Sequence, residues 1–166
     1  MRGSRDREFV EFVEVSSPRL LRTGELLLGD RQQAEDLVQT ALLKLYAVWG
    51  RERRADPLAY VRRIMLNTRT DWWRKRSTHE HPVAEPPDVG VDDRVDALTR
   101  ADVVARALAT LTVVERATVV LRYYDDLTET QTAVALGVAV GTVKSNSARA
   151  LAKLRVACER DEQECR

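Results

Sequence analysis

The side chains best suited to bind DNA lie near the end of the chain, between Leu127 and Arg155. This stretch is typical of a helix-turn-helix, in which a glycine turn joins a short helix to a longer basic helix. Lysine and arginine reach phosphates, and arginine and asparagine form hydrogen bonds with base edges when such a helix enters a major groove. The exposed face predicted for the longer helix carries Lys144, Ser145, Asn146, Ser147 and Arg149.

The turn between these two helices can be predicted position by position. Two helices packed at a steep angle need a small residue at their contact, a residue able to adopt φ > 0 in the turn, and an apolar anchor. The residues that meet these needs are, in order, Ala133, Gly137 and Val143. Thr128 and Gln131 form the sequence of a capping box, and Thr142 is predicted to cap the second helix. An ordinary helical hairpin with a solvated polar face is the alternative at this point.

A second segment combines positive charge with aromatic rings. This segment, residues 60–76, contains one acidic residue, Asp71, and six basic residues, which are Arg62, Arg63, Arg69, Arg74, Lys75 and Arg76. Cations follow phosphates, and unpaired bases stack on aromatic rings at about 1 to 3 kcal/mol per base. With Trp72, Trp73 and the amide of Asn67, the segment is predicted to hold melted DNA. One of the two tryptophans is expected in the hydrophobic core instead, because adjacent helical residues point about 100° apart.

Composition places these sites in an all-α protein. The chain has 166 residues, 44% of them hydrophobic, which is enough for one ordinary domain or two small ones. Apolar residues recur at helical spacing along most of its length. The net charge of +1 hides a segregation, because the basic segment is followed at once by an acidic, proline-bearing stretch from Ser77 to Asp96. We therefore predict two small helical domains joined by an acidic linker that contains proline.

The first domain is predicted over residues 5–76. Its expected helices cover about residues 5–28, 30–50, 56–67 and 71–76. The first of them contains Pro18, where a kink is expected, and Asp30 and Asp56 are predicted N-caps. The second helix has a broad apolar stripe, made of Ala34, Leu37, Val38, Ala41, Leu42, Leu45, Tyr46 and Trp49. Either this helix is simply the centre of the domain, or the outer edge of its stripe docks on a partner.

A linker and a second domain are predicted to follow. Residues 77–94 hold prolines and many acids with little apolar content, so they should form a flexible linker. The second domain is predicted over residues 95–159. It should contain a helix to Ala109, a helix that starts with the capping box of Thr112 and Glu115, and the helix-turn-helix. Asp125 and Asp126 are expected in a solvated loop before Thr128, outside any catalytic role.

The sequence argues against several other classes of protein. Its start is charged and no apolar run approaches the roughly 18 residues that span a membrane, so a cytoplasmic location without membrane insertion is expected. Cys158 and Cys165 are expected as free thiols, and His79 with His81 lacks further ligands for a metal. With no phosphate loop, nucleophile motif or cluster of acids and histidines, we expect neither an enzyme nor a bound metal or cofactor.

The whole pattern resembles bacterial sigma factors of the extracytoplasmic function (ECF) group, which keep only the second and fourth sigma domains. The resemblance covers about Phe9 to Arg155 and depends on the segments 34–49, 60–76 and 141–155. Many members have arginine at the position of Asn146 and a bulky aromatic residue at that of Leu42. In both departures the chain is similar to the actinobacterial SigE-like subgroup.

The resemblance implies three sets of site residues. Contacts with the clamp helices of RNA polymerase core enzyme would be made by Asp36, Leu37, Gln39, Leu42 and Leu43. Recognition and melting of the minus-ten region would involve Arg62, Arg63, Asn67, Arg69, Trp72, Trp73 and Arg74. The minus-thirty-five element would be read by Thr142, Lys144, Ser145, Asn146 and Arg149. The acidic linker would enter the RNA exit path, and an anti-sigma factor is a further partner that the resemblance makes possible.

Two other classes of protein share part of this pattern. Residues 111–154 also resemble the DNA-binding domain of LuxR-type transcription regulators, which act without being a polymerase subunit. A response regulator of that type would carry an α/β receiver domain, whereas residues 5–76 are predicted to be helical and basic. A helical adaptor that binds only proteins would leave the basic aromatic segment unexplained. The predicted function is therefore promoter-specific initiation by a sigma factor bound to the polymerase core enzyme.

Overall fold

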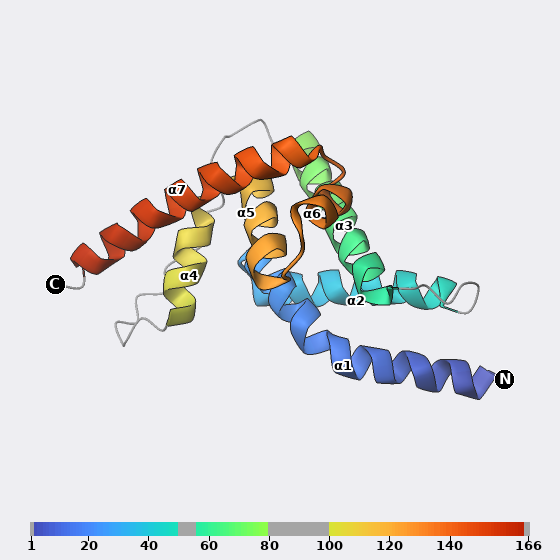
Figure 1. The fold of residues 1–166 in the computed structure, drawn as a ribbon. Helices are drawn as coiled ribbons and strands as arrows, with labels where there is room; N and C mark the ends of the chain where they lie inside the picture. Colours follow the sequence, from blue (N-terminus) through green and yellow to red (C-terminus); the bar gives the residue numbers. More distant parts are fainter. Residues whose placement is uncertain (1, 50–55, 80–99, 165–166) are drawn as a thin grey trace. The chain divides into compact units, whose positions relative to one another are not determined.

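The computed structural model describes residues 2–49, 56–79 and 100–164, and its regular elements in these ranges are all helices (Figure 1). The chain divides into two units, residues 1–82 and 83–166. The predicted all-α class is thus confirmed for the described residues. Most of the predicted linker, from residue 80 to residue 94, lies outside them.

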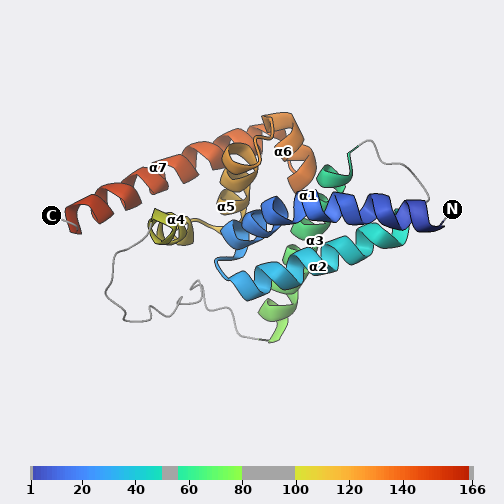
Figure 2. The same cartoon turned by 90° about the horizontal axis from the view of Figure 1, so that it is seen from below.

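The first unit contains three helices, α1 (Arg2–Leu28), α2 (Arg31–Val48) and α3 (Pro57–His79). Helix α1 packs along α2, and α2 packs on α3. Figure 2 shows α1 and α2 side by side. They run antiparallel because Gly29, with a φ of 76°, ends α1 and the Asp30 side chain caps α2 by accepting a 2.7 Å hydrogen bond from the Gln33 N–H. The predicted cap at Asp30 is confirmed.

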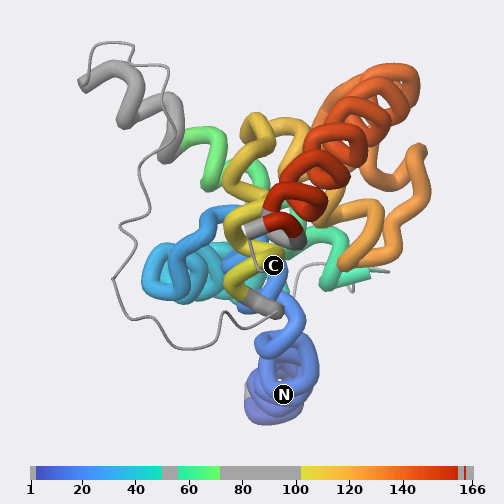
Figure 3. Tube along the Cα trace, turned by 90° about the vertical axis from the view of Figure 1, so that its left-hand side faces the viewer, coloured from blue at the N-terminus to red at the C-terminus, as the bar shows by residue number. Residues whose placement is uncertain are grey.

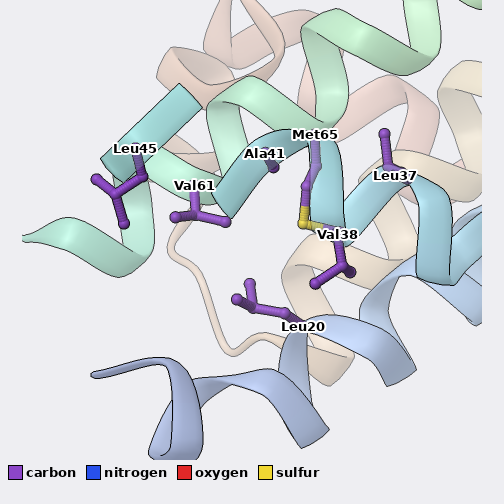
Figure 4. Close-up of a cluster of buried hydrophobic side chains, with 7 residues drawn as sticks. All are labelled: Leu20, Leu37, Val38, Ala41, Leu45, Val61 and Met65. Carbon is purple, nitrogen blue, oxygen red and sulfur yellow. The ribbon is translucent and has the colours of Figure 1, made fainter. Parts of the chain in front are cut away.

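The core of this unit is drawn in Figure 4. One buried cluster takes Leu20 from α1, four residues from α2 and two from α3; its members are Leu20, Leu37, Val38, Ala41, Leu45, Val61 and Met65. The inner half of the predicted stripe therefore forms the centre of the domain. Helices α1 and α2 also approach closely at Gly24, where an added Cβ would lie 3.1 Å from the Cβ of Ala34.

Two helix predictions for this unit need correction. The third and fourth helices predicted here are one continuous helix, α3, which passes through residues 67–71 without a break. No glycine or proline interrupts this stretch, and the Thr70 hydroxyl donates to the Leu66 carbonyl inside the helix at 2.9 Å. The first helix also starts earlier than predicted, because α1 begins at Arg2 and the prediction began at about residue 5. Helix α1 is continuous through Pro18, and Figure 1 shows that it changes direction part way along.

The second unit contains α4 (Arg100–Ala109), α5 (Val113–Val119), a π-helical turn η1 (Val120–Tyr124), α6 (Glu129–Leu136) and α7 (Val140–Glu164). Helices α4, α5 and α6 all pack against α7. Figure 3 follows this unit as a tube from yellow through orange to red. Its longest helix is α7, which therefore provides the platform against which the shorter helices are arranged.

The predicted start of the first helix, at residue 95, lies outside the described residues, and the other helix starts in this unit agree with the sequence with one exception. Both predicted capping boxes form, Thr112 with Glu115 before α5 and Thr128 with Gln131 before α6. The predicted cap at Thr142 is wrong, because α7 already begins at Val140 and the Val143 N–H bonds to the Ala139 carbonyl at 3.2 Å.

The loop before α6 also differs from its prediction. Asp125 is buried, with 4% of its surface exposed, although a solvated position was expected. The backbone explains this burial. The Asp125 N–H bonds to the Val120 carbonyl at 3.0 Å, and this bond closes the π-helical turn and draws Asp125 inward. Asp126, which follows with a φ of 56°, is exposed.

Candidate functional site

An apolar groove of about 840 Å³ runs between α1 and α2. Its wall from α1 consists of Asp6, Phe9, Val10, Val13, Ser17, Pro18 and Leu21. Its wall from α2 consists of Glu35, Val38, Gln39, Leu42, Leu43 and Tyr46. Leu43 is 65% exposed and Val10 is 51% exposed, so the groove presents large apolar side chains to its surroundings. A surface of this kind is suited to bind another protein.

The residues predicted to contact polymerase divide into three kinds on α2. Gln39, Leu42 and Leu43 line the groove, and Asp36 is exposed on the same helix without lining it. Leu37 is completely buried in the core cluster, so it cannot touch a partner, contrary to the prediction. It faces inward because the helical repeat places it with Val38, Ala41 and Leu45 on the core side of the stripe.

Sequence reasoning did not single out the end of the groove, where α1 meets the last turn of α2. The Tyr46 hydroxyl donates to Asp6 Oδ1 at 3.0 Å, and the Arg5 guanidinium donates to the Tyr46 carbonyl at 3.3 Å. The Phe9 ring lies 4.9 Å from the Tyr46 ring and 5.2 Å from the Trp49 ring, between ring centroids. A basic side chain at a helix C-terminus is favourable, so Arg5 also stabilises the end of α2. Only the tertiary structure pairs these distant residues.

On α3, the basic segment has an exposed side and a packed side. Arg63 and Asn67 are exposed and lie four residues apart, on one face of the helix. Arg69 is half-buried, and Arg62 is only 7% exposed, so Arg62 cannot reach DNA unless α3 rearranges, contrary to the prediction. Buried Thr68 accepts a 3.3 Å hydrogen bond from Lys44 Nζ of α2. Trp72, Trp73 and Arg74 belong to α3, but their side chains lie outside the described residues.

The helix-turn-helix forms as its sequence predicts. Ala133 and Val143 are buried, with 5% and 0% of their surfaces exposed. Gly137 has a φ of 68°, the left-handed conformation expected for the turn. Its N–H bonds to the Val134 carbonyl at 3.3 Å, and the Val138 N–H bonds to the Ala133 carbonyl at 3.0 Å, which closes α6.

The predicted duplex contacts on α7 are only partly on one exposed face. Thr142, Lys144, Ser145 and Arg149 are exposed, whereas Ser147 is half-buried and Asn146 is 5% exposed. The prediction that Asn146 belongs to the exposed face is therefore wrong. Its Oδ1 accepts a 2.6 Å hydrogen bond from Arg149 Nη2. Lys144 Nζ lies 3.7 Å from Glu129 Oε2 of α6; the Lys144 side chain is largely exposed and that of Glu129 is half-buried.

An ion pair between a buried carboxylate and a partly exposed lysine attaches α7 to α5. Glu115 is 4% exposed, and its carboxylate lies 2.8 Å from Lys153 Nζ and 2.9 Å from the Thr112 N–H. Burial raises the pKa of this carboxyl, but the hydrogen bonds from Lys153 and Thr112 and the charge of Lys153 outweigh burial. The pKa of Glu115 is consequently below its ordinary value. The capping box indicated Glu115 from the sequence, whereas its partner Lys153 was not predicted.

Two negative findings apply to the described residues. None of their helices is long and apolar enough to cross a membrane. Among them, no group of three or more histidine, cysteine, aspartate or glutamate side chains is arranged to hold a metal ion.

Family comparisons match both units. Residues 12–79 match the family described as Sigma-70 region 2, and residues 101–154 match Sigma-70, region 4. The RNA polymerase sigma-E factor of Streptomyces avermitilis is 42% identical over 151 residues, which cover 89% of this chain and 83% of that protein. The ECF RNA polymerase sigma factor SigM of Mycobacterium tuberculosis is 38% identical over 138 residues, or 82% of this chain and 69% of SigM.

Solved structures show the same fold. The sigma factor RpoE of Bartonella quintana, in complex with the anti-sigma factor NepR, gives a TM-score of 0.73 at 25% identity over 92% of this chain and 98% of that chain. CnrH, in complex with the cytosolic domain of CnrY, gives a TM-score of 0.65 at 20% identity over 94% of this chain and 90% of that chain. The matches do not support the LuxR-type alternative.

Proposed function

This chain belongs to the ECF group of bacterial RNA polymerase sigma factors, in its sigma-E-like subgroup, and we propose how its two units divide the work of promoter recognition. As a sigma factor it binds RNA polymerase core enzyme and promoter DNA and directs transcription initiation. The proposal concerns which residues perform each part of this task.

The polymerase core enzyme would dock on the groove between α1 and α2. The single observation that carries this assignment is that Gln39, Leu42 and Leu43, predicted as polymerase contacts, line one apolar groove with large exposed side chains. Burying such surface is favourable by about 25 cal/mol per Å². Asp36 would contribute at the edge of the groove, and the contacts between Arg5, Asp6 and Tyr46 would fix its end.

Promoter DNA would be shared between the two units. The exposed Arg63 and Asn67 of α3, with Trp72, Trp73 and Arg74 further along the helix, would capture the melted minus-ten strand. Thr142, Lys144, Ser145 and Arg149 of α7 would contact the minus-thirty-five duplex. The proposed units cover residues 5–76 and 95–159, with residues 77–94 as an acidic linker in the RNA exit path.

The remaining parts of the proposal follow from this role. The chain would supply no catalytic residue of its own, because the polymerase performs the chemistry. A protein that works on the chromosome with RNA polymerase acts in the bacterial cytoplasm. The similarity to RpoE, which was crystallised in complex with the anti-sigma factor NepR, supports an anti-sigma factor as a partner that would limit access to polymerase.

The groove assignment can be tested with a matched pair of variants. Leu43→Asp places a charge in the groove, and Val15→Asp places the same charge on α1, where Val15 is 83% exposed and outside the groove. We expect Leu43→Asp to weaken binding to polymerase core enzyme at least about tenfold. Val15→Asp should bind as the wild type does. Affinity is measured by fluorescence anisotropy of the labelled protein with sigma-free core enzyme, and equal affinities for both variants would contradict the assignment.

Initiation itself is tested by run-off transcription. Sigma-free bacterial core enzyme is supplied with a genomic promoter library, with and without this protein. We expect initiation at a discrete set of start sites only when the protein is present. Sequence-specific duplex binding by the protein alone, without any support of initiation, would instead favour an ordinary transcription regulator.

A further inference from the structure

Within the DNA-binding role proposed above, on which this inference rests, we propose that Asn146 is a positioning residue that sets the base preference of Arg149. The two residues lie three positions apart on α7. Asn146 is 5% exposed, whereas Arg149 is exposed. A buried amide thus holds an exposed cation at the predicted DNA-contacting surface.

The burial of Asn146 follows from its place on the inward face of α7. Val143 and Ala150, three and four residues away, are completely buried. The Asn146 amide therefore interrupts a row of apolar side chains, where a polar group needs a hydrogen-bond partner. Arg149 supplies that partner through Nη2, which lies 2.6 Å from Asn146 Oδ1.

The chemistry of the two groups defines the orientation of this contact. A guanidinium has only donors, so the amide oxygen of Asn146 is the atom that must face Arg149. The bond occupies one N–H of the guanidinium and leaves its other donors for an external acceptor. Because Asn146 is anchored in the packed interior, the position of the Arg149 head is anchored with it.

An anchored arginine differs from a free one in what it can read. A flexible side chain loses rotamer freedom when it binds, and holding it in place beforehand reduces that loss. Bidentate hydrogen bonds from arginine to guanine distinguish this base from the others, provided that the two planes are aligned. We therefore expect Arg149 to read a guanine in the upstream element, at a position that depends on Asn146.

The other cation predicted on this surface lacks such an anchor. Lys144 is paired with Glu129 at 3.7 Å, and 64% and 40% of their side chains are exposed. Surface pairs of this kind impose little geometry. Lys144 is therefore expected to act on phosphates without base preference, which makes it a useful contrast to Arg149.

The experiment measures base preference with the full chain bound to polymerase core enzyme. A promoter with a randomised upstream element is selected for binding, and the preference at each base pair is determined by sequencing. The variants are Asn146→Ala, Arg149→Ala and both together, with Arg155→Ala removing a cation elsewhere on α7. Arg149→Ala should lower the preference for guanine at one base pair by roughly 5- to 150-fold.

Asn146→Ala is expected to lower the preference at that same base pair while the salt dependence of binding stays unchanged, because the charge of Arg149 is retained. The double variant should lose no more preference than Arg149→Ala alone. Asn146→Asp keeps the size of the side chain and adds a charge that competes with DNA for Arg149. This variant should reduce the salt slope by about one and remains informative if the alanine variant fails to fold.

An even loss of preference at all base pairs in Asn146→Ala would overturn the proposal, as would additive effects in the double variant. Arg155→Ala should leave the preference at the Arg149 base pair unchanged, and a loss there would mean that charge alone sets it. If wild-type holoenzyme selects no upstream sequence at all, the proposed function of α7 fails, which is a different result from a change confined to Asn146.

Discussion

At the residue scale, one buried carboxylate has two structural roles. Glu115 is both the third residue of a capping box and the partner of Lys153, so one carboxylate fixes the start of α5 and attaches α7 to it. Breaking a buried hydrogen-bonded pair by removing one partner costs more than the pair itself contributes. The position of α7, the helix proposed to contact DNA, therefore depends on a buried residue of α5.

We predict that Glu115→Gln lowers the free energy of unfolding of the second unit by about 1 to 3 kcal/mol near neutral pH. The physical reason is the loss of the charge that faces Lys153 Nζ at 2.8 Å. Hydrogen exchange of amides in α5 and α7 measures this change. Glu159→Gln, which alters an exposed carboxylate of α7, is the matched control and should leave exchange unchanged.

The same pair predicts a pH dependence. The pKa of Glu115 is lowered in the folded state, so its contribution is fully present above the unfolded value of about 4.3 and is lost as the pH falls through the folded pKa. Wild-type protein should therefore lose stability in this acidic range, and Glu115→Gln should lose less. Parallel losses in the two proteins would show that Glu115 does not cause the transition.

At the element scale, the helix-turn-helix depends on one backbone conformation. Gly137 has a φ of 68°, and a Cβ added there would meet nothing within 4 Å. A side chain at this position would therefore lower stability only through the backbone conformation, because it would clash with no neighbouring atom. Left-handed conformations cost L-residues roughly 1 to 2 kcal/mol.

This backbone cost predicts opposite effects of the same substitution at two glycines. Gly137→Ala should lower the stability of the second unit by about 1 kcal/mol. Gly141→Ala, inside α7 and equally free of steric contacts, should raise it by up to about 1 kcal/mol because alanine favours a helix. Chemical denaturation followed by circular dichroism, with hydrogen exchange of α6 and α7, compares the two. Equal destabilisation would show that side-chain volume decides the outcome.

At the scale of the whole molecule, the two units are expected to act at different steps. Lys144→Ala should weaken binding of the upstream duplex for all sequences and lower the salt slope by about one. Trp72→Ala or Trp73→Ala should instead impair promoter opening, because stacking on unpaired bases is gained only after melting. Closed-complex formation is measured by filter binding and opening by permanganate reactivity. Equal loss of closed complexes in all three variants would contradict this division.

The free protein should bind promoter DNA much more weakly than the holoenzyme. Among the described residues, the proposed DNA contacts include few exposed cations, namely Arg63 on α3 and Lys144 and Arg149 on α7. Attachment to one polymerase raises the effective concentration of the second unit once the first is bound. Titration of one labelled promoter with the free protein and with the holoenzyme at the same salt concentration compares the two. Similar affinities would mean that polymerase does not organise the two units.

Local sequence was sufficient for features that depend on neighbouring residues. The capping boxes of Thr112 and Thr128, the cap at Asp30 and the left-handed Gly137 all formed as expected, because each involves residues within a few positions. Residue types also identified the helix-turn-helix, whose Ala133 and Val143 are buried as predicted. Which side chains of α2, α3 and α7 are exposed could be determined only from the packed structure.

Tertiary packing decided which residues of each candidate site are exposed. Leu37, Arg62 and Asn146 lie in segments predicted to be functional, but all three are buried in the folded chain. The groove between α1 and α2 and the pair of Glu115 with Lys153 join residues far apart in the chain. A helical repeat shows which residues share a face, whereas only the contacts between helices determine which face is covered.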